Sequence, residues 1–380
     1  MKIIGEKKWL PAVASLGFLL LCVCSFRTAA QDQAKPASEA PKTAEQHFKN
    51  IQVLKDIPAD QLIPTMQFIA ASLGVECEFC HVEHEMQKDD KKTKVTARKM
   101  IMMELAINKN HFDTEIDVTC YTCHRGTPHP VGTPILSAEA NRPAPPKNEE
   151  TAETKPNLPS ADQILDKYLA AVGGAGALMK IKSRVQKGNL AAGPMQAPIE
   201  VYSEAPDKRV SISHTQGGES VTAFNGEVGW LSIRNGVHRM TGSEREAARI
   251  DAQVYFPARV RELYKDFSVK PGEDINGHST YLVIAKASAP NQPLLQLYFD
   301  QITGLLLRQM RFAQTPLGRN PTQIDYADYR DADGVKIPYQ WTLTRPNGSF
   351  TIKIDQVQQN VAIDPKLFVA PSEPPPPPAK

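Results

Sequence analysis

The sequence predicts a multidomain chain in which a mainly α-helical domain precedes an α+β domain built on a long antiparallel sheet. The 380 residues exceed what a single core usually needs, so two domains joined by a linker are expected. Apolar residues recur at helical spacing up to about residue 110, and their period falls to two from about residue 198. Proline gathers in two stretches, which indicates a linker and a tail.

The overall composition is ordinary for a globular protein, with 41% hydrophobic and 23% charged residues. The formal net charge of +2 gives no electrostatic reason to expect a nucleic-acid partner.

Residues 1–30 are typical of a signal peptide. Lys2, Lys7 and Lys8 precede an apolar run, and small residues end the segment before Gln31. The alternative is an uncleaved membrane anchor, because the apolar run is nearly long enough to span a bilayer. We therefore expect a periplasmic or exported protein, with membrane association through this segment as the alternative.

Four cysteines follow the signal segment, in two pairs that each precede a histidine. The pairs are Cys77 and Cys80 before His81, and Cys120 and Cys123 before His124. This C-x-x-C-H pattern is the attachment signature of c-type haem, in which two thiols bond to the porphyrin and the adjoining imidazole binds iron. The sequence therefore predicts two covalently bound haem c groups, attached by the four cysteines, with His81 and His124 as the proximal iron ligands.

Paired cysteines of this kind have two alternative uses. A zinc ribbon also contains paired C-x-x-C segments, and exported proteins often form disulfides. Neither requires a histidine after both pairs, so the pattern favours haem.

A methionine upstream of each attachment site is a candidate distal iron ligand. Met66 lies in a helix expected over Gln61–Leu73, and Met100 lies in one expected over Thr96–Asn108. Met103 is the runner-up for the second haem, and His111 would replace methionine in a bis-histidine haem. Methionines on an apolar helical face also occur as core residues, which is the structural alternative.

With these residues in view, the segment from about His47 to Pro130 resembles the photosynthetic reaction centre cytochrome c subunit family. The similarity lies in Phe48–Lys55, the Met66 helix, Ala97–Ile101 and Val118–Gly126. The resemblance implies a helix followed by an attachment site for each haem, neighbouring haems that exchange electrons, and methionine as distal ligand at Met66 and Met100. The well-known members carry four haems, whereas this chain has two attachment sites.

Residues 131–159 are expected to be a Pro-rich linker and residues 371–380 a Pro-rich tail. Between them, residues 160–370 begin with a helix that has a capping box at Ser160 and Gln163. A second helix is expected over Ser243–Tyr264, broken at Pro257. Nine strands are expected, namely Pro198–Glu204, Lys208–His214, Ser220–Phe224, Ser279–Ala285, Leu294–Phe299, Leu305–Phe312, Gln323–Tyr329, Lys336–Thr344 and Ser349–Val357. Turn residues are Asn225-Gly226, Asn235-Gly236, Asp333-Gly334 and Asn347-Gly348.

At the level of the fold, this second domain resembles the half-barrel of lipoprotein-carrier proteins. The resemblance implies an apolar or lipid-like ligand on the concave face, and a rigid scaffold for the first domain is the alternative. No nucleophile–base arrangement is evident there, since His214, His238 and His278 are scattered in the sequence.

Three functions are weighed. The first is an electron carrier, not an enzyme, that delivers single electrons to a photosynthetic reaction centre or a respiratory complex. The second is a dihaem peroxidase, which needs an open iron position. The third is a redox sensor that binds a lipid or quinone in the half-barrel. The charged run Lys88–Lys99 is interpreted either as a docking patch for the redox partner or as a solvated loop.

Overall fold

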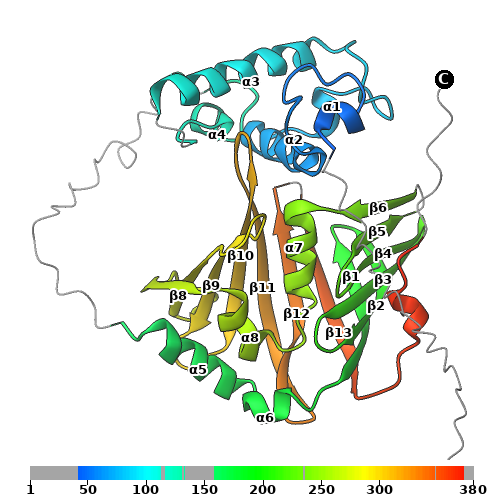
Figure 1. Ribbon diagram of the computed structural model, residues 1–380, viewed down its shortest axis with the longest axis vertical. Coiled ribbons are helices and arrows are strands. Elements are labelled where there is room, and N and C mark those ends of the chain that lie inside the picture. The colour runs from blue at the N-terminus through cyan, green and yellow to red at the C-terminus, as the bar shows by residue number, and fades with distance from the viewer. Residues whose placement is uncertain are drawn as a thin grey trace, which may run out of the picture. The chain divides into compact units, whose positions relative to one another are not determined.

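The computed structural model describes residues 42–112, 116–130, 132, 158–233, 236–346 and 348–371, which belong to one compact unit, Pro41–Lys380 (Figure 1). The expected signal segment 1–30 lies outside the described residues. So do nearly all of the expected linker 131–159 and all but the first residue of the expected tail 371–380, together with Asn235 and Asn347 of the expected turns.

The first region is helical, as the sequence predicts. Its α-helices are α1 (Ala44–His47), α2 (Ala59–Leu73), α3 (Lys92–His111) and α4 (Cys120–His124), with a short 3-10 helix, η1 (Cys77–Phe79), between α2 and α3. The helices expected over Gln61–Leu73 and Thr96–Asn108 are confirmed as parts of α2 and α3.

The second region is one antiparallel sheet of thirteen strands. They are β1 (Ser183–Ala192), β2 (Met195–Glu204), β3 (Lys208–Thr215), β4 (Gly218–Asn225), β5 (Gly229–Ile233), β6 (Gly236–Met240), β7 (Asp266–Pro271), β8 (Thr280–Lys286), β9 (Leu294–Asp300), β10 (Leu306–Thr315), β11 (Gly318–Ala332), β12 (Val335–Arg345) and β13 (Gly348–Gln359). Their order is β6-β5-β4-β3-β2-β1-β13-β12-β11-β10-β9-β8-β7. Pairing of the first strand with the last therefore joins two meandering halves.

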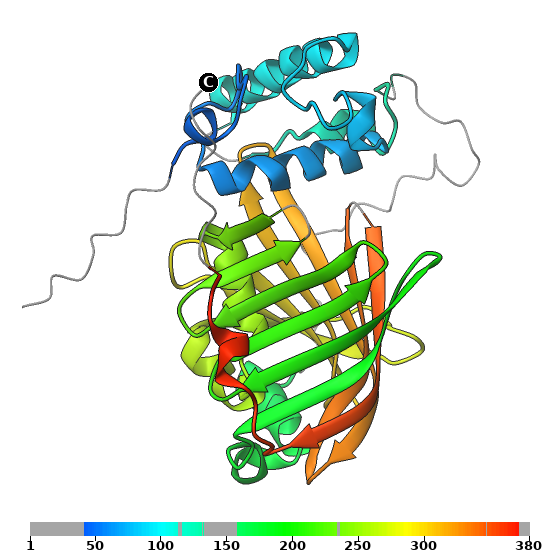
Figure 2. The same ribbon diagram turned by 90° about the vertical axis from the view of Figure 1, so that its right-hand side faces the viewer.

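Helices cover one face of this sheet. They are α5 (Ala161–Ala171), α6 (Gly174–Leu178), α7 (Gly242–Asp251) and α8 (Phe256–Leu263), and Figure 1 shows α7 and α8 in front of the strands. The short helix η2 (Pro365–Phe368) lies on the opposite face, as Figure 2 shows in red. Leu165 of α5 packs with Leu295, Leu297 and Phe299 of β9 in the main core, where all four side chains are fully buried.

All nine expected strands are confirmed, and the capping box at Ser160 is present with both of its hydrogen bonds. Strands β1, β5, β6 and β7 were not predicted. The helical segment expected over Ser243–Tyr264 is confirmed as two helices, but the break lies at 252–255 and not at Pro257. Pro257 lies in the first turn of α8, where its missing N–H costs nothing, so it helps to begin a helix and does not break one.

The tip of the β10–β11 hairpin joins the core of the helical region. Leu317 is fully buried in a cluster with Leu62, Ile69 and Ile101. A Cβ atom added to Gly318 would lie 2.6 Å from the ring of Phe68, so the hairpin backbone approaches α2 closely. The two regions therefore share a packed contact.

We expect Leu317→Ala to destabilise the protein by about 2–5 kcal/mol, the usual cost of removing a buried leucine side chain. Urea unfolding followed by circular dichroism measures the change. Ile302→Ala is the matched control, because Ile302 is 85% exposed and its truncation should leave the midpoint unchanged. Equal midpoints for Leu317→Ala and the wild type would contradict the packing described.

In the part of the chain that the structure describes, no helix combines the length and the apolar character needed to cross a membrane.

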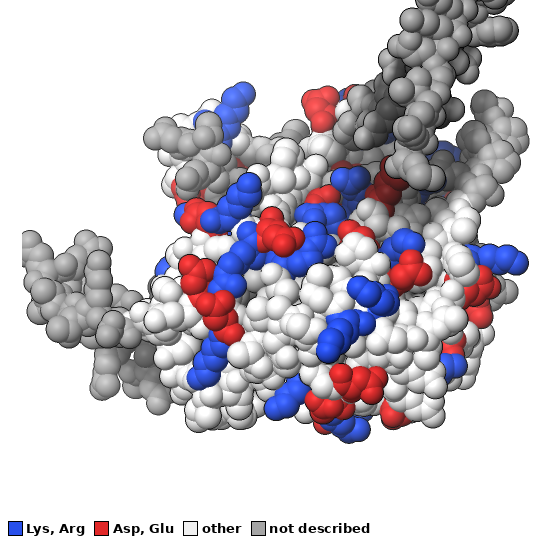
Figure 3. All heavy atoms as spheres, turned by 60° about the horizontal axis from the view of Figure 1, so that its bottom comes forward, with Lys and Arg blue, Asp and Glu red and all other residues white. Residues whose placement is uncertain are grey.

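On the face shown in Figure 3, which looks at the lower end of Figure 1, basic and acidic side chains are interspersed. This face therefore carries no patch of a single charge.

Candidate functional site

Both C-x-x-C-H segments form short turns of helix. The first lies on η1 and continues through Cys80 to His81, and the second is α4 itself. All four cysteines are free thiols, and Cys77 and Cys123 are exposed. The Cys77 and Cys123 thiols are therefore accessible to another group.

Each histidine of the motif is oriented by a backbone carbonyl. The Nδ1 atom of His81 lies 2.9 Å from the carbonyl oxygen of Met86, and Nδ1 of His124 lies 3.0 Å from that of Thr127. A carbonyl can only accept, so Nδ1 donates and Nε2 is left with its lone pair. The Nε2 atoms of His81 and His124 have no hydrogen-bond partner among the described residues. This is the arrangement of a metal-binding histidine, whose second nitrogen is fixed by a donor bond.

The second attachment helix is held against the end of α2. Thr119 and Thr122 form a capping box at its start, and Arg125 ends it in the left-handed conformation. The N–H of Gly126 then donates to the carbonyl of Ser72 at 2.9 Å. Gly74, the C-cap of α2, also has a positive φ of 65°, and a Cβ there would lie 2.2 Å from the Gly126 oxygen.

Gly74→Ala is therefore expected to lower stability by about 1–3 kcal/mol, from backbone strain and overpacking together. Thermal unfolding with an optical readout measures the change. Gly193→Ala is a matched control for the strain, because Gly193 has a φ of 56° with open space around its Cα. The same loss in both variants would mean that the approach of α2 to Gly126 has no energetic role.

The first attachment site is braced by the start of α3. Lys91 Nζ donates to the carbonyl of Glu78, and Thr93 Oγ1 donates to that of Phe79 at 2.5 Å. Asp89 accepts from Arg98 at 2.9 Å and from Asn50 at 3.0 Å, and forms an ion pair with Lys94.

From Lys92 onward the charged run Lys88–Lys99 belongs to α3 and is not a loop, while its interpretation as a docking patch stays a prediction. Residues from Lys92 onward are helical, and Lys88, Lys91, Lys94 and Arg98 bond within the protein.

Hydrogen bonds from Arg98 first, and from Asn50 and Lys94, hold the pKa of Asp89 well below its usual range. A carboxylate with a lowered folded-state pKa stabilises the fold above its unfolded pKa, and this contribution is lost as the pH falls through the folded value. Asp89→Asn should therefore lower the unfolding midpoint at pH 7, and the difference from wild type should shrink progressively below about pH 4. Urea titrations at several pH values measure it. Asp333→Asn in the β11–β12 turn is a control, and a pH-independent difference for Asp89→Asn would contradict the ion-pair account.

Glu104 of α3 lies beside the second attachment site. It is 5% exposed, and its Oε2 accepts from the Cys120 thiol at 2.8 Å. Burial raises the pKa of Glu104 to about 7, and burial followed by this contact raises the pKa of Cys120. Oε1 of Glu104 is buried without a hydrogen-bond partner among the described residues.

The candidate distal ligands lie on the expected helices. Met66 is half-buried in the cluster of α2 that also includes Cys120. Met100 and Met103 are 41% and 49% exposed on α3, so exposure favours neither of them as the distal ligand. His111 ends α3 and is exposed.

Many of the exposed large apolar side chains lie in the helical region that carries the two motifs. Nine large apolar side chains are exposed between residues 63 and 121, namely Ile63, Phe79, Met86, Val95, Met100, Met102, Met103, Ile116 and Tyr121. Where such side chains form a contiguous patch, they mark a surface that another group covers. Paired thiols, oriented imidazoles and apolar surroundings fit a covalently held haem, whose ring is large and mostly apolar.

The histidines of the sheet region each contact a carboxylate. His238 pairs with Glu244 at 2.7 Å, His214 with Glu219 at 3.3 Å and His278 with Asp300 at 2.6 Å. The sequence does not predict these pairs, because folding brings each histidine to a carboxylate that lies elsewhere in the chain.

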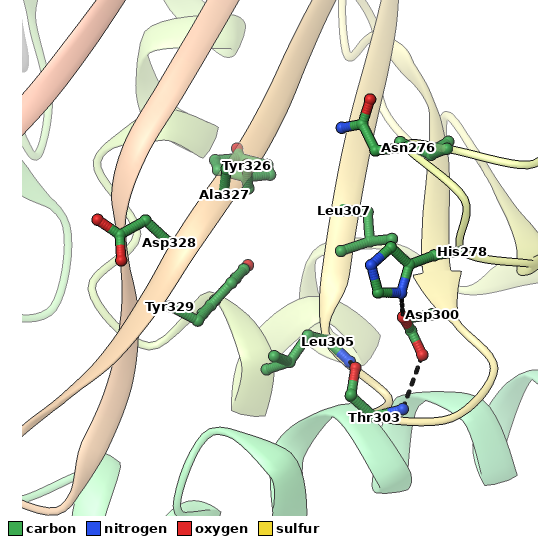
Figure 4. Close-up of a pocket in the computed structure, with 11 residues that line it drawn as sticks. Asn276, His278, Asp300, Thr303, Leu305, Leu307, Tyr326, Ala327, Asp328 and Tyr329 are labelled. Carbon is green, nitrogen blue, oxygen red and sulfur yellow. Dashed lines mark hydrogen bonds and ion pairs between the residues drawn. The ribbon is translucent and has the colours of Figure 1, made fainter.

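His278 and Asp300 line a pocket of about 240 Å³, together with Thr303, Tyr326 and Tyr329 (Figure 4). Burial would raise the pKa of Asp300, but the N–H groups of Thr303 and Ile302 and the contact with His278 hold it below its usual value. The pocket is smaller than most ligand sites, and no serine or cysteine lines it.

The two oriented C-x-x-C-H sites on a helical scaffold agree with the comparison to known families. Residues 24–185 match the photosynthetic reaction centre cytochrome C subunit family. The matched range contains both attachment sites, α1 to α6 and the start of the sheet, and it includes the whole segment from His47 to Pro130 whose resemblance the sequence analysis described.

Curated relatives of this family align with part of the chain. The photosynthetic reaction center cytochrome c subunit of Thermochromatium tepidum is 38% identical over 105 residues, which are 26% of this chain and 26% of that protein. The subunit of Roseobacter denitrificans is 37% identical over 110 residues, 24% of this chain and 29% of that protein. Cytochrome c-554 of Chloroflexus aurantiacus is 30% identical over 87 residues, 21% of each. The chain thus spans about a quarter of the length of the relatives it matches.

The sheet region is similar in fold to solved structures. A DUF1329 family protein from Desulfovibrio piger aligns over 55% of this chain and 96% of its own, with 14% identity and a TM-score of 0.40. A LolA superfamily protein from Nitrosomonas europaea aligns over 56% and 99%, with 11% identity and a TM-score of 0.38. The predicted likeness to lipoprotein carriers concerns the fold, and no ligand follows from it.

Proposed function

We propose that this chain is an exported dihaem c-type cytochrome that transfers single electrons to a photosynthetic or respiratory partner complex. The single observation that carries the proposal is the pair of C-x-x-C-H sites in which both histidines have Nδ1 bound to a backbone carbonyl. Family similarity over residues 24–185 supports covalent haem c, and the second motif supports two of them.

Haem supplies an iron that accepts and releases one electron when bound, and this chain's residues set its surroundings. The four thiols would hold the porphyrin edges, and His81 and His124 would bind iron through Nε2. We assign Met66 and Met100 as distal ligands, with Met103 as the alternative to Met100. A thioether distal ligand favours the ferrous state and raises the reduction potential.

Electron transfer is preferred to catalysis for two reasons. Both proposed irons have a methionine available, whereas a peroxidase needs an open position. Of the carboxylate-paired histidines only His278 is among the residues that line the pocket in Figure 4, and no serine or cysteine lines that pocket.

An optical redox titration of the full chain tests the function. We expect two reversible one-electron steps and no turnover of hydrogen peroxide. Irreversible reduction, or peroxide turnover with a high-spin ferric signal at one haem, would favour the enzyme. A lysate from cells that lack cytochrome maturation is the control, and it should give no titratable signal.

A further inference from the structure

The backbone carbonyl of Met86 bonds two different side chains. Its oxygen accepts from Nδ1 of His81, 2.9 Å away, and from Nζ of Lys94, 2.8 Å away. A carbonyl oxygen has two lone pairs, so it accepts both bonds at once. One oxygen atom therefore connects the ammonium group of Lys94 to the imidazole that we assign to the first iron.

Lys94 is fixed in this position. It lies in the first turn of α3 and is 8% exposed. Its Nζ also donates to the carbonyl of Lys88 at 2.7 Å and forms an ion pair with Asp89 at 3.1 Å. An ammonium group has three N–H donors, and these three contacts use all of them. The side chain of Lys94 therefore has little freedom to leave the Met86 carbonyl.

The charges bonded around Lys94 leave a net positive charge. Asp89 carries one negative charge, which it shares between Lys94 and Arg98, whose Nη2 lies 2.9 Å from Oδ1. Glu85 adds nothing to this balance, because it pairs with Lys88 at 2.7 Å. The carboxylate thus offsets only part of the charge that Lys94 and Arg98 bring to the first attachment site.

The second attachment site differs in this respect. Nδ1 of His124 lies 3.0 Å from the carbonyl oxygen of Thr127, and that oxygen accepts no further hydrogen bond among the described residues. The imidazoles of His81 and His124 are oriented in the same way, but only that of His81 shares its acceptor with a cation.

A cation on the shared carbonyl affects the first iron site in two ways. A hydrogen bond from Nδ1 to a carbonyl raises the basicity of a metal-binding imidazole, and a more basic ligand favours ferric iron. Lys94 draws electron density from the Met86 oxygen, so it weakens this effect on His81. Its positive charge, held where little water screens it, also disfavours the more positive ferric state. Both effects raise the reduction potential.

We propose that Lys94 is a positioning residue that raises the reduction potential of the first haem through the carbonyl of Met86. The inference rests on the proposed function, because it requires His81 to bind iron. Asp89 has the opposite effect, since its carboxylate offsets part of the charge of Lys94.

Spectroelectrochemical titration of the full haem-loaded chain tests the proposal. Lys94→Gln should lower the potential of one haem by about 59 mV and leave that of the other unchanged. This corresponds to a change of about tenfold in the ratio of ferrous to ferric iron, the lower end of the usual effect of losing an outer hydrogen-bond partner at a metal site.

Cysteine variants assign the shifted step to a haem. The effect of Lys94→Gln should persist when Cys120 and Cys123 are both replaced by serine, because the first attachment site is intact. It should disappear when Cys77 and Cys80 are replaced instead. A shift that follows the second attachment site would overturn the proposal.

Two further variants separate charge from packing. Lys92→Gln is the matched control, because Lys92 lies in the same turn of α3 but is exposed, and both potentials should stay unchanged. Lys94→Arg keeps the charge and the donors, so it should stay close to the wild-type potential. Equal shifts in Lys94→Gln and Lys94→Arg would mean that Lys94 acts only by packing, which overturns the proposal.

Two titratable haems with unchanged potentials in Lys94→Gln would overturn this inference and leave the proposed function intact. A chain without a titratable haem would contradict the proposed function, and the inference with it. If Lys94→Gln does not fold, the double variant Asp89→Asn with Lys94→Gln decides, because it removes both members of the ion pair. Its first haem should have a lower potential than that of Asp89→Asn alone, and equal potentials would overturn the proposal.

Discussion

Replacing Cys120 and Cys123 together by serine is expected to remove one of two haems and to halve the haem absorbance per chain. A hydroxyl cannot form the thioether bond, and the Nε2 of His124 alone gives no covalent attachment. The intact mass of the variant should fall by one haem after correction for the two substitutions. Cys77→Ser with Cys80→Ser should do the same at the first site, and all four together should give a colourless protein.

Tyr121→Phe is the matched control for these variants. Tyr121 lies between the two cysteines of α4 and is 56% exposed, so losing its hydroxyl should leave both haems attached. A double-serine variant that kept the full haem content would contradict the assignment of Cys120 and Cys123.

Met66→Ala is expected to convert one haem from low spin to high spin and to abolish its methionine–iron absorption in the near infrared. Because the choice of axial ligands spans about 0.8 V, loss of the thioether should lower that haem's potential by an amount on the order of 0.1 V. Spectroelectrochemistry of the full chain measures both effects.

Met179→Ala is the control, since Met179 is 47% exposed beside α6 in the sheet region. Met100→Ala and Met103→Ala, made separately, identify the ligand of the other haem, and only one of them should change the spectrum. If Met66→Ala leaves both haems low spin, the methionine assignment for α2 is wrong and the residue is part of the core.

The motifs and the helices that carry them could be predicted from the sequence because their signals are local. The helical repeat around Met66 and the C-x-x-C-H spacing depend on neighbouring residues only. The carbonyls of Met86 and Thr127 that orient the histidines could not be predicted, since any residue type supplies a carbonyl. Leu317 was missed because its contact with α2 spans most of the chain.

Strand β1 shows why a strand can be missing from the prediction. Its sequence places the polar residues Arg184 and Gln186 on the face of the sheet that α7 covers, where the usual pattern requires apolar residues. A bulge at Lys187 and Gly188 also shifts its alternation. Conversely, the charged residues of Lys88–Lys99 are evident in the sequence, but their partners are not. Lys94 and Arg98 pair with Asp89, and Lys91 bonds the backbone carbonyl of Glu78.

Intact mass of the exported protein under denaturing conditions, combined with its pyridine haemochrome spectrum, tests the assignment of two covalent haems most directly. The account predicts a polypeptide that retains the mass of two haems after unfolding, with the spectrum of porphyrin bound through two thioethers. A colourless chain of unmodified mass, or one whose cysteines are bridged or hold zinc, would contradict it.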